Sequence, residues 1–516
     1  MKRRTIKQSK HEKQDKMVNI PFLYTDLEAN KQEISQRLGE SSDINIRELT
    51  IQEKKAAVIF IDGLANKDVI QHYLIENLIG LKWNTEDESP DKLYQLLQSS
   101  SISTAELSSL NNFETLVNHL LEGDTILLID GYAEGFAVGS YGLKERGVEA
   151  PTTQQVVRGP KDAFTETLSV NTALVRKRIK DPNLWFQSFQ LGEKTHTEVT
   201  IAYLHGVVQP KIVKEVEQRL QCINVASILE SGNIEELIQD KTYTPFPTVF
   251  NSERPDSISA GILEGKVAIF IDGTPFVLLV PALLVDFLHS SEDHYQRHDI
   301  ATFIRTLRFI AFFFALLTPS TYIALTTFHQ EMIPTTLLIS LAAQREGIPF
   351  PALVEALIME VTFELLREAG IRLPSPVGSA ISIVGALVLG QAAVDAGIVS
   401  ATMVIVVSLT AICSFIFPSY NLAISVRLLR FCFMILAATL GLFGIFIGIL
   451  LMALHLSSLR SFGIPYLSPF APFIPSDQKD AVIRKPFWAL FTRPRLINQR
   501  DITKEDTPKP KPANKR

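Results

Sequence analysis

Charged side chains interrupt an apolar segment in the C-terminal half of this 516-residue chain. Within residues 349–370, Glu360, Glu364 and Arg367 follow one another at spacings of four and three residues. On an α-helix these spacings place the three side chains on one face. Lipid does not tolerate such a face. The helix is therefore predicted either to lie at a membrane surface or to turn this face towards protein or water.

A second segment, ALVLGQAAVDAGIVSATMVIVV at 386–407, contains Gln391 and Asp395. A carboxylate at the centre of a bilayer costs about 3 kcal/mol or more, so its presence needs an explanation. In one interpretation, 377–394 and 398–417 form a helical hairpin whose turn places Asp395 at the membrane surface. In the other, Gln391 and Asp395 face a water-filled passage. The turn is the simpler explanation of Asp395 because it needs no function.

Gln391 is surrounded by small residues, namely Gly385, Gly390, Ala392 and Ala393. Small residues let helices approach closely, so Gln391 could be a hydrogen-bonding partner in a helix–helix contact. A pore wall made of small and weakly polar side chains has the same composition. The sequence leaves both interpretations of Gln391 open.

The elements that carry these residues belong to a chain with two unlike halves. Hydrophobic residues make up 46% and charged residues 20%, and the formal net charge is −5. Residues 1–300 hold most of the charge, whereas 303–456 are overwhelmingly apolar. This asymmetry is typical of a water-soluble region fused to a membrane domain. The basic N-terminus has no apolar run behind it, so no secretory signal is predicted and the first half is expected in the cytosol.

Strands and helices are both expected in the first half. Three segments share an apolar run, Ile-Asp-Gly and a second apolar run: residues 56–70, 124–138 and 266–280. Asp-Gly between apolar runs favours a hairpin because the turn needs positive φ. This turn geometry explains Asp62, Asp130 and Asp272 better than catalysis does.

The predicted fold class is therefore a cytosolic α/β N-terminal region with two subdomains, followed by an all-α polytopic membrane domain. The α/β subdomains are placed at 21–150 and 151–300, and about four to six membrane segments at 301–456. A disordered basic tail is predicted at 1–20 and a largely flexible C-terminal tail at 457–516.

The membrane domain opens at 303–328, where Arg305 and Arg308 lie at the end attached to the soluble region. Basic residues favour the cytoplasmic side, so this span is predicted to run from inside to outside. Residues 332–343 are too short to cross the ~30 Å hydrocarbon core, and further spans are predicted at 377–394, 398–417 and 431–455. Basic residues, Arg427 and Arg430, precede the last span and a basic tail follows it. One span cannot leave both on the same side, and a cytoplasmic tail is favoured.

Other clusters favour structural explanations. His294 and His298 lie four residues apart, as in zinc sites, but no third spaced ligand follows, so a polar connector is the better interpretation. Arg176, Lys177 and Arg178 are candidates for contact with anionic lipid headgroups. Nucleic acid is the alternative partner for these three residues, and a solvated helix face is the favoured explanation.

Signatures of enzymes and cofactor sites are missing from the sequence. It contains no phosphate-binding loop, nucleophile elbow or kinase signature. Its three cysteines form neither a metal-binding motif nor a disulfide framework. Neither enzymatic activity nor a cofactor, catalytic residue or metal site is therefore predicted.

Four long blocks of the sequence recur together in one known family. They are PTTQQVVRGPKDAFTETLSVNTALVRKRI (151–179), YTPFPTVFNSERPDSISAGILEGKVAIFIDGTPFVLLVP (243–281), PFPALVEALIMEVTFELLREAGIRLP (349–374) and GALVLGQAAVDAGIVS (385–400). In this order they resemble the A subunits of GerA-type spore germinant receptors. The resemblance covers nearly the whole chain and is far more specific than one short motif. Its departures are mild, such as Lys161-Asp162-Ala163 where an Arg-Glu pair is common.

The resemblance implies an integral protein of the bacterial spore inner membrane that acts with a transporter-like B subunit and a lipoprotein C subunit. It also implies that the receptor senses nutrients, that the A subunits oligomerise into a ring around a gated ion channel, and that the nutrient pocket belongs to the B subunit. A nucleic-acid partner is not expected.

A channel needs a hydrated path, so polar residues inside its spans are candidates for the lining. Under the resemblance, Gln391 and Val394 become candidate pore-lining residues, and Glu360 and Glu364 become a candidate cation vestibule. The alternative is a membrane scaffold that assembles the receptor without conducting ions. A secondary transporter is disfavoured, because no repeated halves are visible between 303 and 456.

Overall fold

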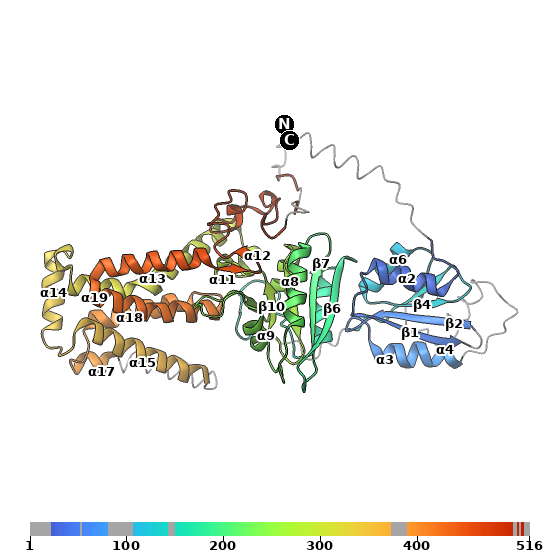
Figure 1. The fold of residues 1–516 in the computed structure, drawn as a ribbon, viewed down its shortest axis with the longest axis horizontal. Coiled ribbons are helices and arrows are strands. Elements are labelled where there is room, and N and C mark those ends of the chain that lie inside the picture. The colour runs from blue at the N-terminus through green and yellow to red at the C-terminus, as the bar shows by residue number, and fades with distance from the viewer. Residues whose placement is uncertain are drawn as a thin grey trace, which may run out of the picture. The chain divides into compact units, whose positions relative to one another are not determined.

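The structure of the chain, a computed structural model, describes residues 22–51, 54–80, 107–142, 150–372, 390–498, 503–504 and 507–509. The tail predicted at 1–20 and most of the span predicted at 377–394 lie outside these residues. Strands and helices alternate in the first part of the chain, and helices dominate after residue 280 (Figure 1). The predicted fold class, an α/β region followed by a helical region, is confirmed.

The chain divides into two compact units. The first comprises Met1–Pro151, Lys161–Ile234 and Ser252–Leu278, and the second comprises Thr152–Pro160, Glu235–Asn251 and Leu279–Arg516. The second unit therefore holds the whole helical region together with two short pieces from earlier in the sequence. The subdomain boundaries at 150 and 300 stay predictions.

The α/β region contains one succession of elements twice. The first copy consists of α2 (Leu27–Arg37), β1 (Ile44–Ile51), β2 (Lys54–Ile61), α3 (Lys67–Val69), a π-helical turn (Ile70–Ile75), α4 (Glu76–Gly80), β3 (Leu107–Leu110), α6 (Phe113–Glu122), β4 (Thr125–Ile129) and β5 (Gly135–Val138). The second consists of α7 (Leu168–Arg178), β6 (Leu184–Leu191), β7 (Thr197–Leu204), α8 (Pro210–Gln221), α9 (Ser231–Ile238), β8 (Phe250–Ser252), α10 (Pro255–Leu263), β9 (Val267–Ile271) and β10 (Val277–Val280).

Both copies build a five-stranded sheet on the same plan. The strand order is β1-β2-β4-β5-β3 in the first sheet and β6-β7-β9-β10-β8 in the second. The first two strands of each copy pair antiparallel, with Ile44 opposite Ile61 and Leu184 opposite Leu204. The central strands β4 and β9 are buried at every position, which explains their unbroken apolar sequences.

Each copy holds its first helix with the aspartate of an Asp-Gly turn. Asp130 Oδ1 accepts a hydrogen bond from the backbone N–H of Leu27, and Asp272 Oδ1 accepts one from that of Leu168, both at 3.1 Å. The glycine after each aspartate has a φ of +89°. A carboxylate at a helix N-terminus pairs a free N–H and complements the helix dipole. The interpretation of these two aspartates as turn residues is confirmed. Each of them also binds the N-terminus of the first helix of its copy.

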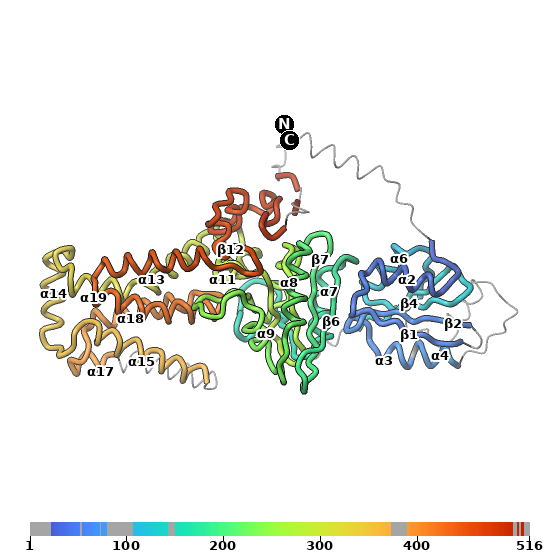
Figure 2. Tube along the Cα trace, in the orientation of Figure 1, coloured from blue at the N-terminus to red at the C-terminus, as the bar shows by residue number. Residues whose placement is uncertain are grey.

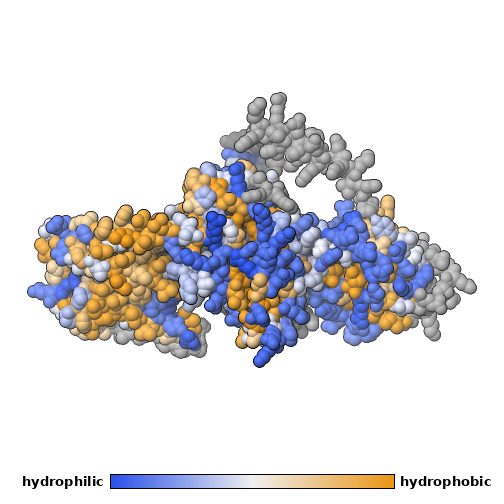
Figure 3. All heavy atoms as spheres, in the orientation of Figure 1, coloured by the Kyte–Doolittle hydropathy of each residue, from blue (hydrophilic) through white to orange (hydrophobic). Residues whose placement is uncertain are grey.

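The helical region contains α11 (Leu284–Leu288), α12 (Glu292–Tyr295), α13 (His298–Thr327), α14 (Thr335–Arg345), α15 (Ala352–Arg372), α17 (Gly390–Asp395), α18 (Ala401–Phe415) and α19 (Tyr420–Ser458). Its core includes the fully buried residues Ala315 on α13, Met403 on α18 and Ala437 on α19. Its outer surface is apolar as well, as the orange area over these helices in Figure 3 shows. By length and composition, α13 and α19 are able to cross a membrane.

α19 is longer than one membrane crossing because it reverses direction at Gly441. This residue has φ +63° and ψ −142°, a conformation outside the helical range that favours glycine. A Cβ on Gly444 would lie 2.1 Å from the carbonyl O of Leu436, and one on Gly448 would lie 2.6 Å from the Phe433 ring. A straight helix rises 1.5 Å per residue and would hold these pairs far apart. The two arms of α19 therefore lie antiparallel (Figure 2).

The reversal of α19 explains how basic residues can both precede and follow this helix at the same end of the helical region. A single span at 431–455 was expected to separate the arginines before it from the basic tail after it. In the structure both arms meet the same short segment: Ser425 donates a hydrogen bond to the carbonyl O of Pro245, and His455 Nε2 lies 2.9 Å from the Thr244 hydroxyl. The expectation of one span was wrong, and the sequences flanking α19 lie at the same end of the helical region.

The segment after α19 is folded, whereas the sequence predicted a largely flexible tail from residue 457. It contains β11 (Arg460–Ser461), β12 (Ile464–Pro465) and two 3₁₀ turns (Gln478–Asp480 and Phe487–Ala489). Tyr466 is fully buried, and its carbonyl O accepts a hydrogen bond from the Leu284 N–H at 3.0 Å. The expectation of a flexible tail therefore does not hold for residues 459–498. The sequence contains no sign of this fold, because the buried residues there follow neither a helical nor a strand period.

Replacing Gly441 by alanine is expected to destabilise the helical region. A Cβ at this position would lie 2.6 Å from His329 Cε1 and 3.0 Å from Phe328 Cβ, and the backbone conformation is unfavourable for other residues. We expect the Tm of the purified protein to fall by roughly 4–8 °C. Gly347→Ala is the control, since its Cβ would meet nothing within 4 Å. Equal effects of the two substitutions would contradict the reversal at Gly441.

Candidate functional site

Two ion pairs join α15 to the first arm of α19. Glu360 Oε2 accepts a hydrogen bond from Arg430 Nη1, and Glu364 Oε2 accepts one from Arg427 Nη1, each at 2.5 Å. The inner pair is almost completely buried, with both side chains 1% exposed, whereas Glu364 of the outer pair is 27% exposed. The spacings of four and three residues make the pairs successive rungs between two helices. We call these four residues the ion-pair seam.

The ion-pair seam settles where the predicted polar face of α15 points. The face turns towards protein, where a guanidinium pairs with each glutamate, and the cation vestibule stays a prediction. Glu360 Oε1, Glu364 Oε1 and the Nε and Nη2 atoms of Arg430 are nevertheless buried without a hydrogen-bond partner among the described residues. Buried polar atoms of this kind bind water. The seam thus offers water a place inside an otherwise apolar region.

A third carboxylate of α15, Glu355, is fully buried at the start of α18. Its Oε2 accepts a hydrogen bond from the Ser400 N–H at 3.0 Å, and its Oε1 lies 3.3 Å from Arg345 Nε. Ser400 is the N-cap of α18, so Glu355 complements the positive end of that helix. Sequence reasoning gave Glu355 no role. The available signal was its spacing, five residues before Glu360, which places it on a different side of α15.

Gln391 and Val394 lie in the short helix α17, on a different element from the ion-pair seam. Gln391 Nε2 donates a hydrogen bond to Asp395 Oδ1 at 2.9 Å, and both side chains are exposed, while Val394 is half-buried. α17 ends at Asp395, and Gly397 has a φ of +66° before α18 begins. This is the turn expected for Asp395. Gln391 is not buried in a helix contact of its own chain, and its place in a pore wall stays a prediction.

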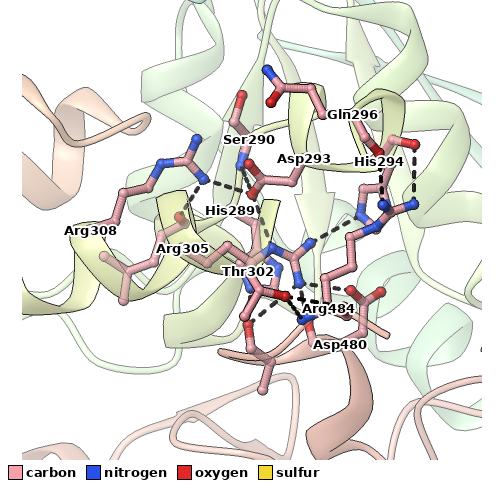
Figure 4. A network of polar contacts seen from close by, with 12 residues as sticks. His289, Ser290, Asp293, His294, Gln296, Thr302, Arg305, Arg308, Asp480 and Arg484 are labelled. Carbon is pink, nitrogen blue, oxygen red and sulfur yellow. Dashed lines mark hydrogen bonds and ion pairs between the residues drawn. The ribbon is translucent and has the colours of Figure 1, made fainter. Parts of the chain in front are cut away.

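A second cluster of buried charges lies where α12 is followed by α13 (Figure 4). Asp293 Oδ2 accepts hydrogen bonds from Arg305 Nε at 3.1 Å and from Arg308 Nη1 at 2.6 Å. Arg305 is completely buried and Asp293 is 2% exposed. The two arginines were predicted to mark the cytoplasmic side of the first span. Because they are buried and paired, they hold α12 against α13 and are not exposed to lipid headgroups.

The C-terminal segment completes this cluster. Arg305 Nη1 donates a hydrogen bond to Asp480 Oδ1 at 2.7 Å, and the backbone N–H of Arg484 donates one to Thr302 Oγ1 at 3.1 Å (Figure 4). The Arg484 guanidinium donates to two carbonyl groups at the end of α12, at 3.0 and 3.2 Å. We call this group the Arg305 network, consisting of Asp293, Arg305, Arg308, Asp480 and Arg484.

The two histidines that the sequence singled out belong to different helices, α12 and α13. His294 Nε2 lies 3.5 Å from Arg305 Nη2, beside the Arg305 network, whereas His298 is the first residue of α13. Among the described ranges, the group whose ligand atoms lie close enough for a metal is a different one, His119, Glu122 and Asp124. A hydrogen-bonded contact at the end of α6, 2.7 Å between His119 Nδ1 and Asp124 Oδ2, explains that group without an ion.

Of the three basic residues that were candidates for lipid contact, with a solvated helix face favoured, only Lys177 is exposed. Arg176 is completely buried, with hydrogen bonds from Nε and Nη2 to Asp43 Oδ2 at 3.0 and 2.8 Å. Arg178 pairs with Asp162 and is about four-fifths buried. A buried guanidinium cannot reach a headgroup, so Arg176 is removed from the lipid hypothesis. For Lys177 the hypothesis stays a prediction.

Removing the charge of Asp293 is expected to destabilise the helical region strongly. Asp293→Asn would leave the buried Arg305 and Arg308 without their shared carboxylate, at a cost of about 3–5 kcal/mol. Thermal unfolding of the purified full-length protein measures this loss. The control is Asp299→Asn, which breaks an exposed pair with Arg297 and should change little. Similar melting of the two variants would contradict the stabilising role of the network.

The stability of the same region is expected to depend on pH through His289. Burial and the charge of Arg305 hold the pKa of His289 well below its ordinary value of 6.5, and its Nε2 lies 2.6 Å from the Ala481 carbonyl O. The unfolded chain binds a proton near that value and the folded chain does not. Stability is therefore full above about pH 6.5 and is lost as the pH falls below it.

Melting curves between about pH 7.5 and 5.5 check this dependence. His289→Gln keeps an N–H donor for Ala481 but cannot be protonated, so the decrease of Tm with acidity should be smaller. His72→Gln, a change at an exposed histidine, should leave the pH dependence as it is. If the His289 variant loses stability with acid as steeply as the unchanged protein, the assignment fails.

Comparison with known proteins places this arrangement in a family. The family model for the Bacillus/Clostridium GerA spore germination protein matches residues 32–496. The chain is 47% identical over 511 residues to spore germination protein KA of Bacillus subtilis (strain 168), covering 98% of this chain and 92% of that protein. It is 42% identical over 473 residues to spore germination protein GerLA of Bacillus cereus, covering 91% of this chain and 95% of that protein.

Among the solved structures similar to this chain is one that covers about half of it. It is the crystal structure of the N-terminal domain of the A subunit of the Bacillus megaterium spore germinant receptor GerK3. Its sequence is 38% identical to this chain, and the match covers 52% of this chain and 98% of that domain with a TM-score of 0.42.

Proposed function

Because this chain belongs to the Bacillus/Clostridium GerA spore germination protein family, we propose that it is the A subunit of a nutrient germinant receptor and that its helical region conducts ions. In this proposal the protein lies in the spore inner membrane with its α/β region in the cytosol. It acts with a transporter-like B subunit and a lipoprotein C subunit, and several copies assemble into a ring around a nutrient-gated channel.

The observation that carries the conducting role is the ion-pair seam. An ion that crosses a bilayer needs polar atoms in place of its water shell, and charged residues inside spans mark such paths. The inner rung, Glu360 and Arg430, lies between apolar helices and retains buried atoms without a protein partner. The outer rung is partly exposed through Glu364. Together they supply the polar atoms that a hydrated path requires.

α17 supports the same proposal from another position. It exposes Gln391 at the turn before α18 and leaves Val394 half-buried, so neither residue is fixed in the core of this chain. In a ring of identical subunits each such residue recurs around the axis, and a constriction formed there would act as the gate. In this proposal the B subunit binds the nutrient, and this chain responds by opening the channel.

A scaffold that assembles the receptor without conducting ions is the alternative function. The observation in its favour is that arginine pairs with both glutamates of the ion-pair seam, which is also what stable helix packing requires. The two functions predict different effects of shortening a side chain of α17 that is not part of the core. A channel subunit should release potassium without nutrient, whereas a scaffold should not.

Gln391→Ala and Val394→Ala, made singly, are expected to cause potassium release from spores without nutrient. A closed state weakened by about 1.4 kcal/mol would raise the open fraction about tenfold. Ile405→Ala is the control, because it shortens an apolar side chain that is exposed on the neighbouring helix α18. Potassium release and the amount of protein in the spore membrane are measured together.

Normal dormancy and a normal nutrient response, with both variants present in the membrane, would contradict the role of α17. A response altered equally by Ile405→Ala would show a general effect of changes near α18. In either case the gate would have to be sought along the ion-pair seam or in a partner subunit.

A further inference from the structure

The folded C-terminal segment presents an exposed surface of apolar and basic residues. Its apolar members are between 47% and 71% exposed: Phe473, Ile483, Phe487 and Phe491. Basic residues are interleaved with them: Lys479, Lys485, Arg493 and Arg495. Over residues 473–498 the sequence has five basic and two acidic side chains. We call the eight exposed or partly exposed residues the C-terminal patch.

The position of the C-terminal patch follows from its contacts with α13. The backbone of Arg484, between Ile483 and Lys485, makes two hydrogen bonds with the Thr302 hydroxyl (Figure 4). Its N–H donates to Thr302 Oγ1 and its carbonyl O accepts from it, both at 3.1 Å. Phe303, next to Thr302 on α13, is 68% exposed. The patch is therefore fixed beside the level at which the exposed apolar side of α13 begins.

At that level the exposed side chains of the chain change from charged to apolar, as they do at a boundary between water and lipid. Before it, the chain carries the exposed pair Arg297 and Asp299, and after it α13 turns Leu307 and Ile310 outwards. Aromatic residues gather at such boundaries, where their rings reach the lipid and basic side chains reach the phosphates. The composition and the position of the patch thus agree.

The charge of the patch identifies the headgroups that suit it. Asp480, one of the two acidic residues of the segment, is bound to Arg305, so it offers little negative charge to the surroundings. Lys485 and Arg495 are exposed. Each basic residue near an anionic membrane strengthens the attraction roughly fivefold, whereas a neutral membrane gives no such gain.

We propose that the C-terminal patch binds the anionic phospholipid surface of the membrane that α13 crosses. The apolar members enter the headgroup boundary, and the basic members contact phosphate groups. Because the Arg305 network ties this segment to α12 and α13, the lipid contact anchors the end of α13 where the chain enters the membrane. This inference is independent of whether the helical region conducts ions.

The chain carries its own probe for this contact in Trp488, beside Phe487. The tryptophans of the sequence are Trp83, Trp185 and Trp488. In a full-length protein with Trp83→Phe and Trp185→Phe, Trp488 is therefore the single source of tryptophan fluorescence. It is placed in nanodiscs whose lipids carry bromine near the headgroup end of the acyl chains. The nanodiscs are made of phosphatidylcholine alone or with an equal part of phosphatidylglycerol.

We expect bromine to quench Trp488, and the quenching to be at least about twofold stronger with phosphatidylglycerol. Lys485→Glu with Arg495→Glu should abolish the preference for phosphatidylglycerol, and high salt should weaken it. The matched control, Lys211→Glu with Lys214→Glu, makes the same charge change on exposed residues of α8 and should leave the preference unchanged. Melting curves confirm that each variant is folded.

Absence of quenching in both lipids would overturn the proposal and would indicate that the patch faces a protein partner. Equal quenching in both lipids, unaffected by the charge reversal, would overturn the anionic specificity. Ile483→Ser with Phe487→Ser provides a second measurement that does not rely on charge. It should reduce the quenching of Trp488 in both lipids, and unchanged quenching would count against membrane contact.

Discussion

A buried charge in an apolar helical region must be paired, and the rest of this structure depends on that constraint. Moving an ion out of water costs several kcal/mol, which only a close counter-charge and good hydrogen bonds offset. Two clusters of the described residues show how the helical region meets the constraint. Glu360 faces Arg430 between α15 and α19, and Asp293 faces Arg305 and Arg308 between α12 and α13. The first cluster joins helices that are far apart in the sequence, and the second joins two consecutive helices to the C-terminal segment through Asp480.

The pairing explains why the chain takes this path. The first arm of α19 must run beside α15 for its arginines to meet the glutamates, and the turn at Gly441 brings the second arm back. The C-terminal segment then lies where Asp480 reaches Arg305. Hydrophobic packing alone would allow many registers of these helices, whereas a misplaced buried charge would be costly in all but one of them.

Much of this arrangement was predictable from the sequence, and what was missed has physical reasons. Apolar length and charge asymmetry predict an α/β region followed by helices, and Asp-Gly predicts the turns at Asp130 and Asp272. The spacing of Glu360 and Glu364 predicts a polar face, but it cannot name the arginines of another helix as partners. The pattern also predicts one last span, because a single glycine, Gly441, reverses α19 without any polar or proline signal. In the folded segment at 459–498 the apolar residues follow neither a helical nor a strand period, so the sequence does not predict its fold.

The most direct test is potassium flux through the receptor, with its A, B and C subunits reconstituted in vesicles and a mixture of amino acids and sugars as stimulus. The variant to compare is Glu364→Gln with Arg427→Gln, which removes both charges of the outer rung without changing the net charge. If the ion-pair seam is part of the conducting path, the stimulated flux should change severalfold while the subunits stay assembled. An unchanged flux would contradict this account and would mean that the ion-pair seam serves only to pack α15 against α19.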